Sequence, residues 1–199
     1  MKRLLVATKN QGKFKEIKSA LSGIDFEIFS LKDLGVSPKG LIEDGETFQE
    51  NALKKAQFFY EQTKTLTLAE DSGILVDALP GELGVKTRRW GAGEHATDEE
   101  WIKYFLKKME RIKDGAWGGK FVCAACLFGD GIKEFFEGET RGVLTQEVSA
   151  PILPGLPLSS CFIPEGFEKV YAALTTEEKN RTSHRGKAFL KAKEFLLKF

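Results

Sequence analysis

Two short acidic sequences could supply carboxylates for binding a metal ion or for activating water. Glu70-Asp71-Ser72-Gly73 follows the apolar run at residues 66–69, and Glu43-Asp44-Gly45 precedes a predicted helix. Magnesium prefers carboxylate and phosphate oxygens and usually takes one or two carboxylates from a protein. A further carboxylate can orient or deprotonate a water molecule. Either sequence alone is more often a helix cap or a turn, so only their combination with cationic groups indicates an active site.

The loop at residues 8–13 has the composition of a phosphate-binding turn. It leaves a predicted strand at residues 3–8 and enters a predicted helix at residues 13–21. Free N–H groups and the positive dipole end at a helix start favour an anion. Thr8 and Asn10 are neutral donors, and Lys13 supplies positive charge. The spacing is not that of a Walker A loop, and the alternative is an ordinary strand-to-helix turn.

Lys55 lies in the apolar stripe of a helix predicted at residues 47–62, which Thr47 and Glu50 would open as a capping box. At about 100° per residue, its direction lies within roughly 20° of those of Phe48 and Phe59. An unpaired ammonium is costly to bury, so Lys55 requires a carboxylate or a ligand phosphate. The alternative is that its side chain extends to solvent.

Basic residues also gather near the end of the chain, in the sequence at residues 179–185. Ser183 is predicted to cap the final helix, which places His184 and Arg185 in the first helical turn. Cations there oppose the helix dipole unless an anion is bound. The segment therefore indicates a ligand, and the alternative is a solvated basic turn.

The elements that must position these residues are mixed along the chain. Beyond those named, we expect strands at residues 26–30 and 66–69 and a hairpin of residues 120–128 and 132–138. A helix is expected at residues 97–113, where Thr97 and Glu100 would form a capping box. The tail at residues 175–199 is expected to be helical with an interruption near residues 181–183. Residues 73–79 are apolar again after a polar break. Without strict alternation of strands and helices, the order predicts a mixed α/β fold with a long hairpin rather than a regular doubly wound sheet.

Composition bounds the class of protein. The 199 residues fit one large domain, 1–199, or one domain with a lobe, and 42% hydrophobic residues suffice for a core. A net charge of +1 argues against a protein that coats nucleic acid or an anionic membrane. No apolar stretch approaches the length of a membrane helix, and the one at the N-terminus is too short for a signal peptide. We expect a cytoplasmic protein.

Three cysteines make a disulfide framework improbable. Cys123 and Cys126 form a C-x-x-C sequence inside the apolar run 121–128, which predicts a buried strand. Side chains three apart on a strand point to opposite faces, so the two thiols are predicted to be core residues and not a shared metal or redox site.

Four motifs whose residues could bind a ligand or carry out catalysis follow one another along the chain. They are Thr8-x-Asn10-x-x-Lys13-x-x-Glu16, Glu43-x-Gly45-x-Thr47-Phe48-x-Glu50-Asn51-Ala52-x-x-Lys55-Ala56, Glu70-Asp71-Ser72-Gly73 and Ser183-His184-Arg185. With them the chain resembles the inosine triphosphate pyrophosphatase family, also called dITP/XTP pyrophosphatases, from residue 3 to the last helix. The resemblance implies an elongated two-lobed mixed-sheet α/β fold with a central cleft, usually in a homodimer.

The implied activity is hydrolysis of non-standard purine nucleoside triphosphates such as ITP, dITP and XTP. Water attacks the α-phosphate, pyrophosphate leaves, and Mg²⁺ is required. The resemblance assigns the phosphates to Thr8, Asn10, Lys13 and Lys55, substrate contact to Ser72, Gly155 and Phe162, and the base to Lys179, His184 and Arg185. It assigns metal binding to Glu43, Asp71 and Glu70. The catalytic residues are Lys55 and Asp71, with Asp71 as the general base or a metal-bound carboxylate.

One segment departs from the family pattern. Members usually carry G-F-G-[YW]-D-P-x-F, whereas this chain keeps Gly155 and Phe162 but has Leu158 and Ser159 where the stacking aromatic and the aspartate stand. Leu83 also stands where family members have the proline of a P-G-V turn. Base–aromatic stacking is worth about 1–3 kcal/mol, so base preference is expected to differ. The alternatives are a pyrophosphatase for another modified nucleotide and a non-catalytic nucleotide-binding protein.

Overall fold

A computed structural model describes residues 2–93, 95–112 and 117–199 of the chain. Six strands form one mixed sheet in the order β2-β1-β3-β4-β5-β6. β1 pairs in parallel with β2 and β3, and the remaining neighbours are antiparallel. The strands are β1 (Lys2–Val6), β2 (Phe26–Ser30), β3 (Thr67–Val76), β4 (Gly118–Gly129), β5 (Ile132–Leu144) and β6 (Phe162–Pro164).

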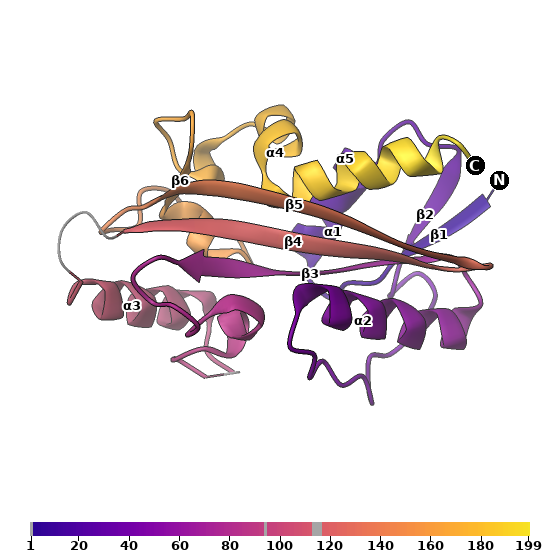
Figure 1. Ribbon diagram of the computed structural model, residues 1–199, viewed down its shortest axis with the longest axis horizontal. Helices are drawn as coiled ribbons and strands as arrows, with labels where there is room; N and C mark the ends of the chain where they lie inside the picture. The colour runs from indigo at the N-terminus through magenta and orange to yellow at the C-terminus, as the bar shows by residue number, and fades with distance from the viewer. Residues whose placement is uncertain (1, 94, 113–116) are drawn as a thin grey trace.

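The helices lie on both faces of this sheet (Figure 1). They are α1 (Gln11–Ala20), α2 (Phe48–Thr63), α3 (Asp98–Met109), α4 (Thr176–Thr182) and α5 (His184–Leu196), with short 3₁₀ helices η1 (Gly84–Arg89), η2 (Pro157–Ser160) and η3 (Tyr171–Ala173). These elements confirm the predicted mixed α/β fold. Among the described residues, no helix is long and apolar enough to cross a membrane.

Buried apolar side chains divide the fold into two lobes. In the first lobe, α2 packs on one face of the sheet around Phe59, while α1 and α5 pack on the other face around Ile17 and Phe189. The second lobe packs α3 and η2 against the far ends of β3, β4 and β5, with Trp101 and Phe162 in its core. The long strands run through both lobes (Figure 1), so the sheet fixes the position of one lobe relative to the other.

The predicted strands and helices are found, with differences in extent at β3, at the end of α3 and at β5, which runs to Leu144 instead of ending at residue 138. The strand at 26–30 is found as predicted, and Asp130 and Gly131 form the turn of the β4–β5 hairpin with positive φ angles. The predicted end of the strand at residue 69 is wrong, because β3 runs unbroken from residue 67 to 76. Its acidic centre stays in the ladder, where Glu70 lies opposite Ala125 and Asp71 opposite Ala124.

The predicted helix starts are found, with one difference in hydrogen bonding. Thr97 and Glu100 form a reciprocal capping box at α3. At α2, Thr47 caps the Glu50 N–H, but the Glu50 carboxylate accepts from Glu46 N rather than from Thr47. α3 ends at Met109, so the predicted helix at residues 110–112 is wrong, and its predicted end at residue 113 lies outside the described residues.

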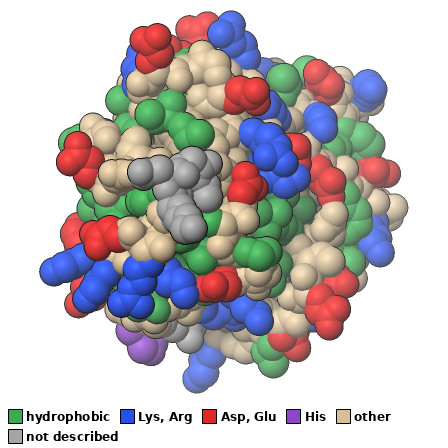
Figure 2. All heavy atoms as spheres, turned by 60° about the vertical axis from the view of Figure 1, so that its left-hand side comes forward, with side chains coloured by type: hydrophobic (Ala, Val, Ile, Leu, Met, Phe, Trp, Pro, Cys, Tyr) green, Lys and Arg blue, Asp and Glu red, His purple; other side chains and the backbone are tan. Residues whose placement is uncertain are grey.

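Cys123 and Cys126 confirm the prediction that the C-x-x-C sequence lies in a buried strand. Cys123 packs on the side of β4 that faces α5, and Cys126 packs on the side that faces α2. Both thiols are fully buried. On the surface at the second-lobe end, acidic, basic and apolar side chains are interspersed (Figure 2).

Candidate active site

A cavity of about 1080 Å³ is lined by residues of both lobes. It is bounded by loop 8–13, α2, the centre of β3, η1, segment 153–159 and the start of α5. Twelve of the predicted site residues line it, namely Thr8, Asn10, Lys13, Glu43, Lys55, Glu70, Asp71, Ser72, Gly155, Lys179, His184 and Arg185. Phe162 does not, because it is fully buried in the second-lobe core, with its ring 4.8 Å from that of Phe121.

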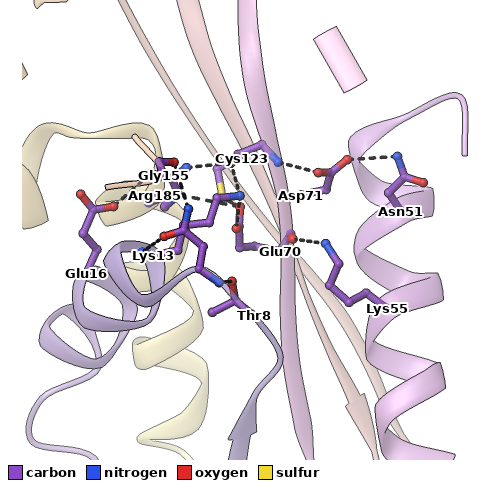
Figure 3. Close-up of polar contacts among 12 residues, drawn as sticks. Thr8, Lys13, Glu16, Asn51, Lys55, Glu70, Asp71, Cys123, Gly155 and Arg185 are labelled. Atoms are coloured by element: carbon purple, nitrogen blue, oxygen red, sulfur yellow. Dashed lines mark hydrogen bonds and ion pairs between the residues drawn. The ribbon is translucent and has the colours of Figure 1, made fainter. Parts of the chain in front are cut away.

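Glu70 is a buried carboxylate held between two cations. Its side chain is 2% exposed, and Oε1 lies 2.6 Å from Lys13 Nζ. Arg185 Nε is 3.8 Å from Oε2, and the Cys123 thiol donates to the same oxygen. Figure 3 shows Lys13 and Arg185 converging on Glu70 from α1 and α5. A buried charge is tolerated only when it is paired in this way.

Burial and the neighbouring cations shift the pKa of Glu70 in opposite directions. Burial raises the pKa of this carboxyl, but Lys13, Arg185 and Lys55 outweigh burial and bring the pKa well below its usual range. Glu70 is therefore ionised and fully engaged with protein cations. The structure gives no support to the predicted metal-binding role of Glu70, because its oxygens face Lys13 and Arg185.

Asp71 points to the opposite side of β3, since successive side chains on a strand alternate. Asn51 Nδ2 donates to its Oδ2 at 3.0 Å, and the Ser72 backbone N–H donates to its Oδ1 at 3.0 Å. Burial raises the pKa of Asp71, and the Glu70 charge raises it further, while Lys55 opposes both. A fixed carboxylate with a raised pKa is suited to accept a proton from water.

Lys55 turns inward, as its place in the apolar stripe of α2 predicted. Its side chain is 14% exposed; Nζ forms an ion pair with Glu43 and donates to the backbone carbonyl of Glu70 at 3.0 Å. Burial lowers its pKa, but the carboxylates of Glu43, Glu70 and Asp71 more than reverse this and raise it. The ammonium is thus charged at the centre of the cavity.

Ser72 joins the two cations that hold Glu70. Its Oγ accepts from Lys13 Nζ at 3.2 Å and from Arg185 Nη2 at 3.0 Å. Arg185 Nη1 also donates to Glu16 at 3.0 Å, which anchors α5 to α1. The Ser72 hydroxyl hydrogen remains available for a ligand that enters the cavity.

Loop 8–13 is organised by Asn10. Its Oδ1 accepts from Lys13 N at 3.1 Å and caps α1, and its Nδ2 donates to the Gly155 carbonyl at 2.9 Å. Thr8 Oγ1 accepts from Asn10 N. The start of α1 therefore faces the cavity with its N–H groups, as expected of an anion site.

His184 is a buried, neutral imidazole in the cavity wall. Its ring stacks on Phe121 at 4.8 Å, and neither ring nitrogen has a hydrogen-bond partner within the described part of the chain. Burial brings its pKa well below the ordinary value, and the charge of Arg185 lowers it further. Ser183 caps α5 through Gly186 N, as predicted. Lys179 also lines the cavity, from α4.

Asn51 is a site residue to which the sequence analysis gave no role. It is 1% exposed; besides donating to Asp71, its Oδ1 accepts from Gly45 N at 2.8 Å. It thereby ties the loop that carries Glu43 to the centre of β3. The signal was present in the sequence, because Asn51 precedes Lys55 by four residues and so shares its helix face.

Known proteins resemble this chain over nearly its whole length. The "dITP/XTP pyrophosphatase" of Oceanobacillus iheyensis is 35% identical over 98% of both chains, and that of Caldanaerobacter subterraneus subsp. tengcongensis is 38% identical over 100% of this chain and 98% of its own. The structure of a HAM1 protein from Coxiella burnetii superposes with a TM-score of 0.84 at 28% identity, covering 100% of both chains.

A second solved structure, the Staphylococcus aureus Ham1 protein, superposes with a TM-score of 0.79 at 28% identity over 98% of both chains. The profile of the Ham1 family matches residues 4–195. With this match, and with relatives at 35–38% identity over nearly the full length, the chain belongs to the Ham1 family.

Proposed function

We propose that this protein hydrolyses non-standard purine nucleoside triphosphates (ITP, dITP and XTP) to the monophosphate and pyrophosphate. The observation that carries the proposal is the convergence of Lys13, Lys55 and Arg185 on one cavity beside the fixed carboxylate of Asp71. Relatives at 35% and 38% identity that span the whole chain are named for this activity.

The cationic side of the cavity would bind the triphosphate. Lys13 and Lys55 approach from opposite faces of β3, and the N–H groups at the start of α1 add uncharged donors. Their carboxylate partners hold both ammonium groups in place before substrate arrives. Such preorganised charge favours a transition state in which negative charge develops on transferred and leaving phosphate oxygens.

Asp71 would act as the general base. A water proton passes to its carboxylate while the water oxygen bonds to the α-phosphorus, and the bond from that phosphorus to the α,β-bridging oxygen breaks. The electron pair leaves with pyrophosphate, and the other product is the nucleoside monophosphate. Asn51 and the Ser72 N–H hold both carboxylate oxygens in place, so the base needs no reorganisation before it accepts the proton.

The acids of the cavity fit a magnesium requirement. Among the described residues, no group of three or more acidic, histidine or cysteine side chains could hold a metal ion. Magnesium usually binds through one or two carboxylates plus substrate phosphates, and Glu43 and Asp71 both line the cavity. With Asp71 as the base, Glu43 would hold Mg²⁺ together with the triphosphate, and the ion would neutralise phosphate charge.

The base-binding end favours a second candidate, a pyrophosphatase for another modified nucleotide. Leu156 and Leu158 line the cavity there, and the Ser159 hydroxyl donates to the Leu156 carbonyl at 2.6 Å instead of facing a ligand. Aliphatic side chains do not provide the stacking of an aromatic ring. The homodimer implied by the resemblance and the cytoplasmic location expected from the apolar pattern of the sequence remain predictions.

The deciding experiment measures pyrophosphate and orthophosphate separately for a panel of nucleoside triphosphates with Mg²⁺. We expect pyrophosphate release with ITP, dITP or XTP preferred over ATP and GTP. Preference for a modified pyrimidine or another altered base would support the second candidate. Binding without turnover of any member would overturn both, and orthophosphate as the main product would overturn the proposed bond cleavage.

A further inference from the structure

Asp98, the first residue of α3, joins two cavity-lining segments. Its Oδ2 accepts a hydrogen bond of 2.5 Å from the backbone N–H of Gly155, which is distant in sequence. Its Oδ1 lies 3.8 Å from Arg88 Nη2, and the side chain is 18% exposed. Arg88 is fixed in turn by donating to the Ala96 carbonyl at 2.7 Å.

This contact differs from the ordinary use of an acid at a helix start. Such acids stabilise the dipole or cap the N–H groups of their own helix, and α3 already has Thr97 and Glu100 for that purpose. Asp98 instead accepts through Oδ2 from the backbone of segment 153–158, which is called the base-binding wall below. A carboxylate that accepts from a backbone N–H forms a charge-assisted bond, about twice as strong as a neutral one.

Gly155 connects Asp98 to the phosphate-binding loop. Its carbonyl accepts from Asn10 Nδ2 at 2.9 Å, so the two sides of one residue are held by different lobes. Gly155 has φ +73°, and a Cβ there would collide with the Asn10 side-chain amide. The position therefore requires glycine for its backbone conformation and for the space.

The rest of the segment lies directly on loop 8–13. A Cβ at Gly12 would lie 3.0 Å from the Pro154 carbonyl oxygen and 3.3 Å from Leu156 Cδ1. The same segment continues into Leu158, which lines the cavity. The location of Gly155 therefore sets how far the base-binding wall stands from the phosphate-binding loop.

We propose that Asp98 is a positioning residue that fixes segment 153–158 over the phosphate-binding loop and thereby sets the space in which the base is bound. This inference rests on the proposed function. Asp98 acts on the base-binding wall through Gly155, whereas Asn10 keeps its own cap on Lys13 N without Asp98. The cap that shapes the phosphate-binding loop therefore does not need Asp98.

The test compares Asp98→Ala, Asp98→Asn and the control Lys103→Gln, which removes a charge from the exposed face of the same helix. For each protein, KM and kcat for the preferred nucleotide, the inhibition constant of inorganic triphosphate and the melting temperature are measured. Asp98→Ala is expected to raise KM about tenfold, the size expected for one charge-assisted hydrogen bond. It should change kcat and the triphosphate inhibition constant by less than about twofold. Asp98→Asn, whose amide oxygen still accepts, should recover most of the lost affinity.

Two outcomes would overturn the inference. One is an unchanged KM in Asp98→Ala, and the other is an equal loss of affinity for nucleotide and inorganic triphosphate. If Asp98→Ala does not fold, Asp98→Glu, which displaces the carboxylate by one methylene group, disturbs the same contact and must show the same split. If the wild-type protein turns over no triphosphate, the proposed function is wrong, and dissociation constants of the same two ligands still decide the role of Asp98.

Discussion

Adjacent acids at residues 70 and 71 have different environments because they point to opposite faces of β3. Glu70 meets Lys13 and Arg185, whose charges stabilise its ionised form. Asp71 faces Asn51 and the cavity, where burial raises its pKa. One acid therefore organises the cations, and the other is the candidate base.

Asp71→Asn is expected to abolish most turnover without unfolding the protein. General-base catalysis contributes about 10²–10⁴-fold, so kcat should fall by at least about a hundredfold. Since the folded state raises the pKa of Asp71, its ionised form destabilises the fold at neutral pH, and the melting temperature should not fall. Steady-state kinetics and thermal melts measure both effects.

Asp44→Asn is the matched control for that substitution. Asp44 is an exposed acid whose Oδ1 lies 2.5 Å from Lys54 Nζ. The Asp44→Asn protein should keep full activity. An active Asp71→Asn protein, or equal losses in the two variants, would remove Asp71 from the mechanism.

His184 is expected to make stability depend on pH. Its folded pKa lies well below 6.5 because the ring is buried and Arg185 is near. Below pH 6.5 the unfolded chain binds a proton that the folded protein does not, so stability falls as pH decreases through this value. His184→Gln should reduce this dependence by up to about 1.4 kcal/mol per pH unit.

Urea unfolding at pH 7, 6 and 5.5 measures this slope. His95→Gln is the control, because His95 is the only other histidine and is exposed. Equal slopes for wild-type protein and His184→Gln would show that the buried imidazole takes up its proton without unfolding.

At the scale of elements, the approach of α5 to the sheet places Arg185 in the cavity. Gly138 on β5 permits this approach, because a Cβ there would collide with the His184 carbonyl and lie 2.8 Å from Ala188 N. Neighbouring Thr140 donates its hydroxyl to the Thr182 carbonyl at 2.7 Å, just before α5 begins. The first turn of α5 is thus fixed against β5 at two points.

Gly138→Ala should therefore damage both stability and substrate binding. Overpacking of this kind costs about 1–3 kcal/mol, and displacement of the α5 start should raise KM more than it lowers kcat. Glu134→Ala on the exposed side of β5 should change stability by less than about 0.5 kcal/mol. Denaturant unfolding and kinetics of the two variants provide the comparison, and a fully stable Gly138→Ala protein would contradict the packing argument.

Elements marked by local signals could be predicted from sequence. The caps at Thr97 and Ser183 and the turn at residues 129–131 depend on neighbouring residues, and the structure has them. The continuity of β3 could not be predicted, because its acidic centre is held in the sheet by pairing with distant β4 and by cations from two helices. Once β3 is known to be a strand, alternation explains why Glu70 and Asp71 diverge.

Residues of one sequence motif do not all lie at the cavity. Gly155 and Phe162 belong to one segment, yet Gly155 borders the cavity and Phe162 lies in the second-lobe core. The chain turns through η2 between them, so their side chains have separate environments. Contacts such as Asp98 to Gly155 join residues far apart in sequence and require the three-dimensional structure.

At the scale of the whole molecule, the long strands join the two lobes that share the cavity (Figure 1). The first lobe supplies Lys13, Lys55 and Asp71, and the second lobe supplies the segment that begins at Gly155. Under the proposed function, phosphate chemistry lies in the first lobe, whereas base binding combines this second-lobe segment with His184 at the start of α5. This division explains how a changed base-binding segment can coexist with an intact set of cations and acids.

The central claim is that water activated in this cavity attacks the α-phosphate. Turnover of ITP in H₂¹⁸O with Mg²⁺, followed by mass spectrometry of both products, tests it most directly. We predict that the ¹⁸O atom enters the nucleoside monophosphate and that the pyrophosphate remains unlabelled. Label in pyrophosphate, or in released orthophosphate, would contradict the claim.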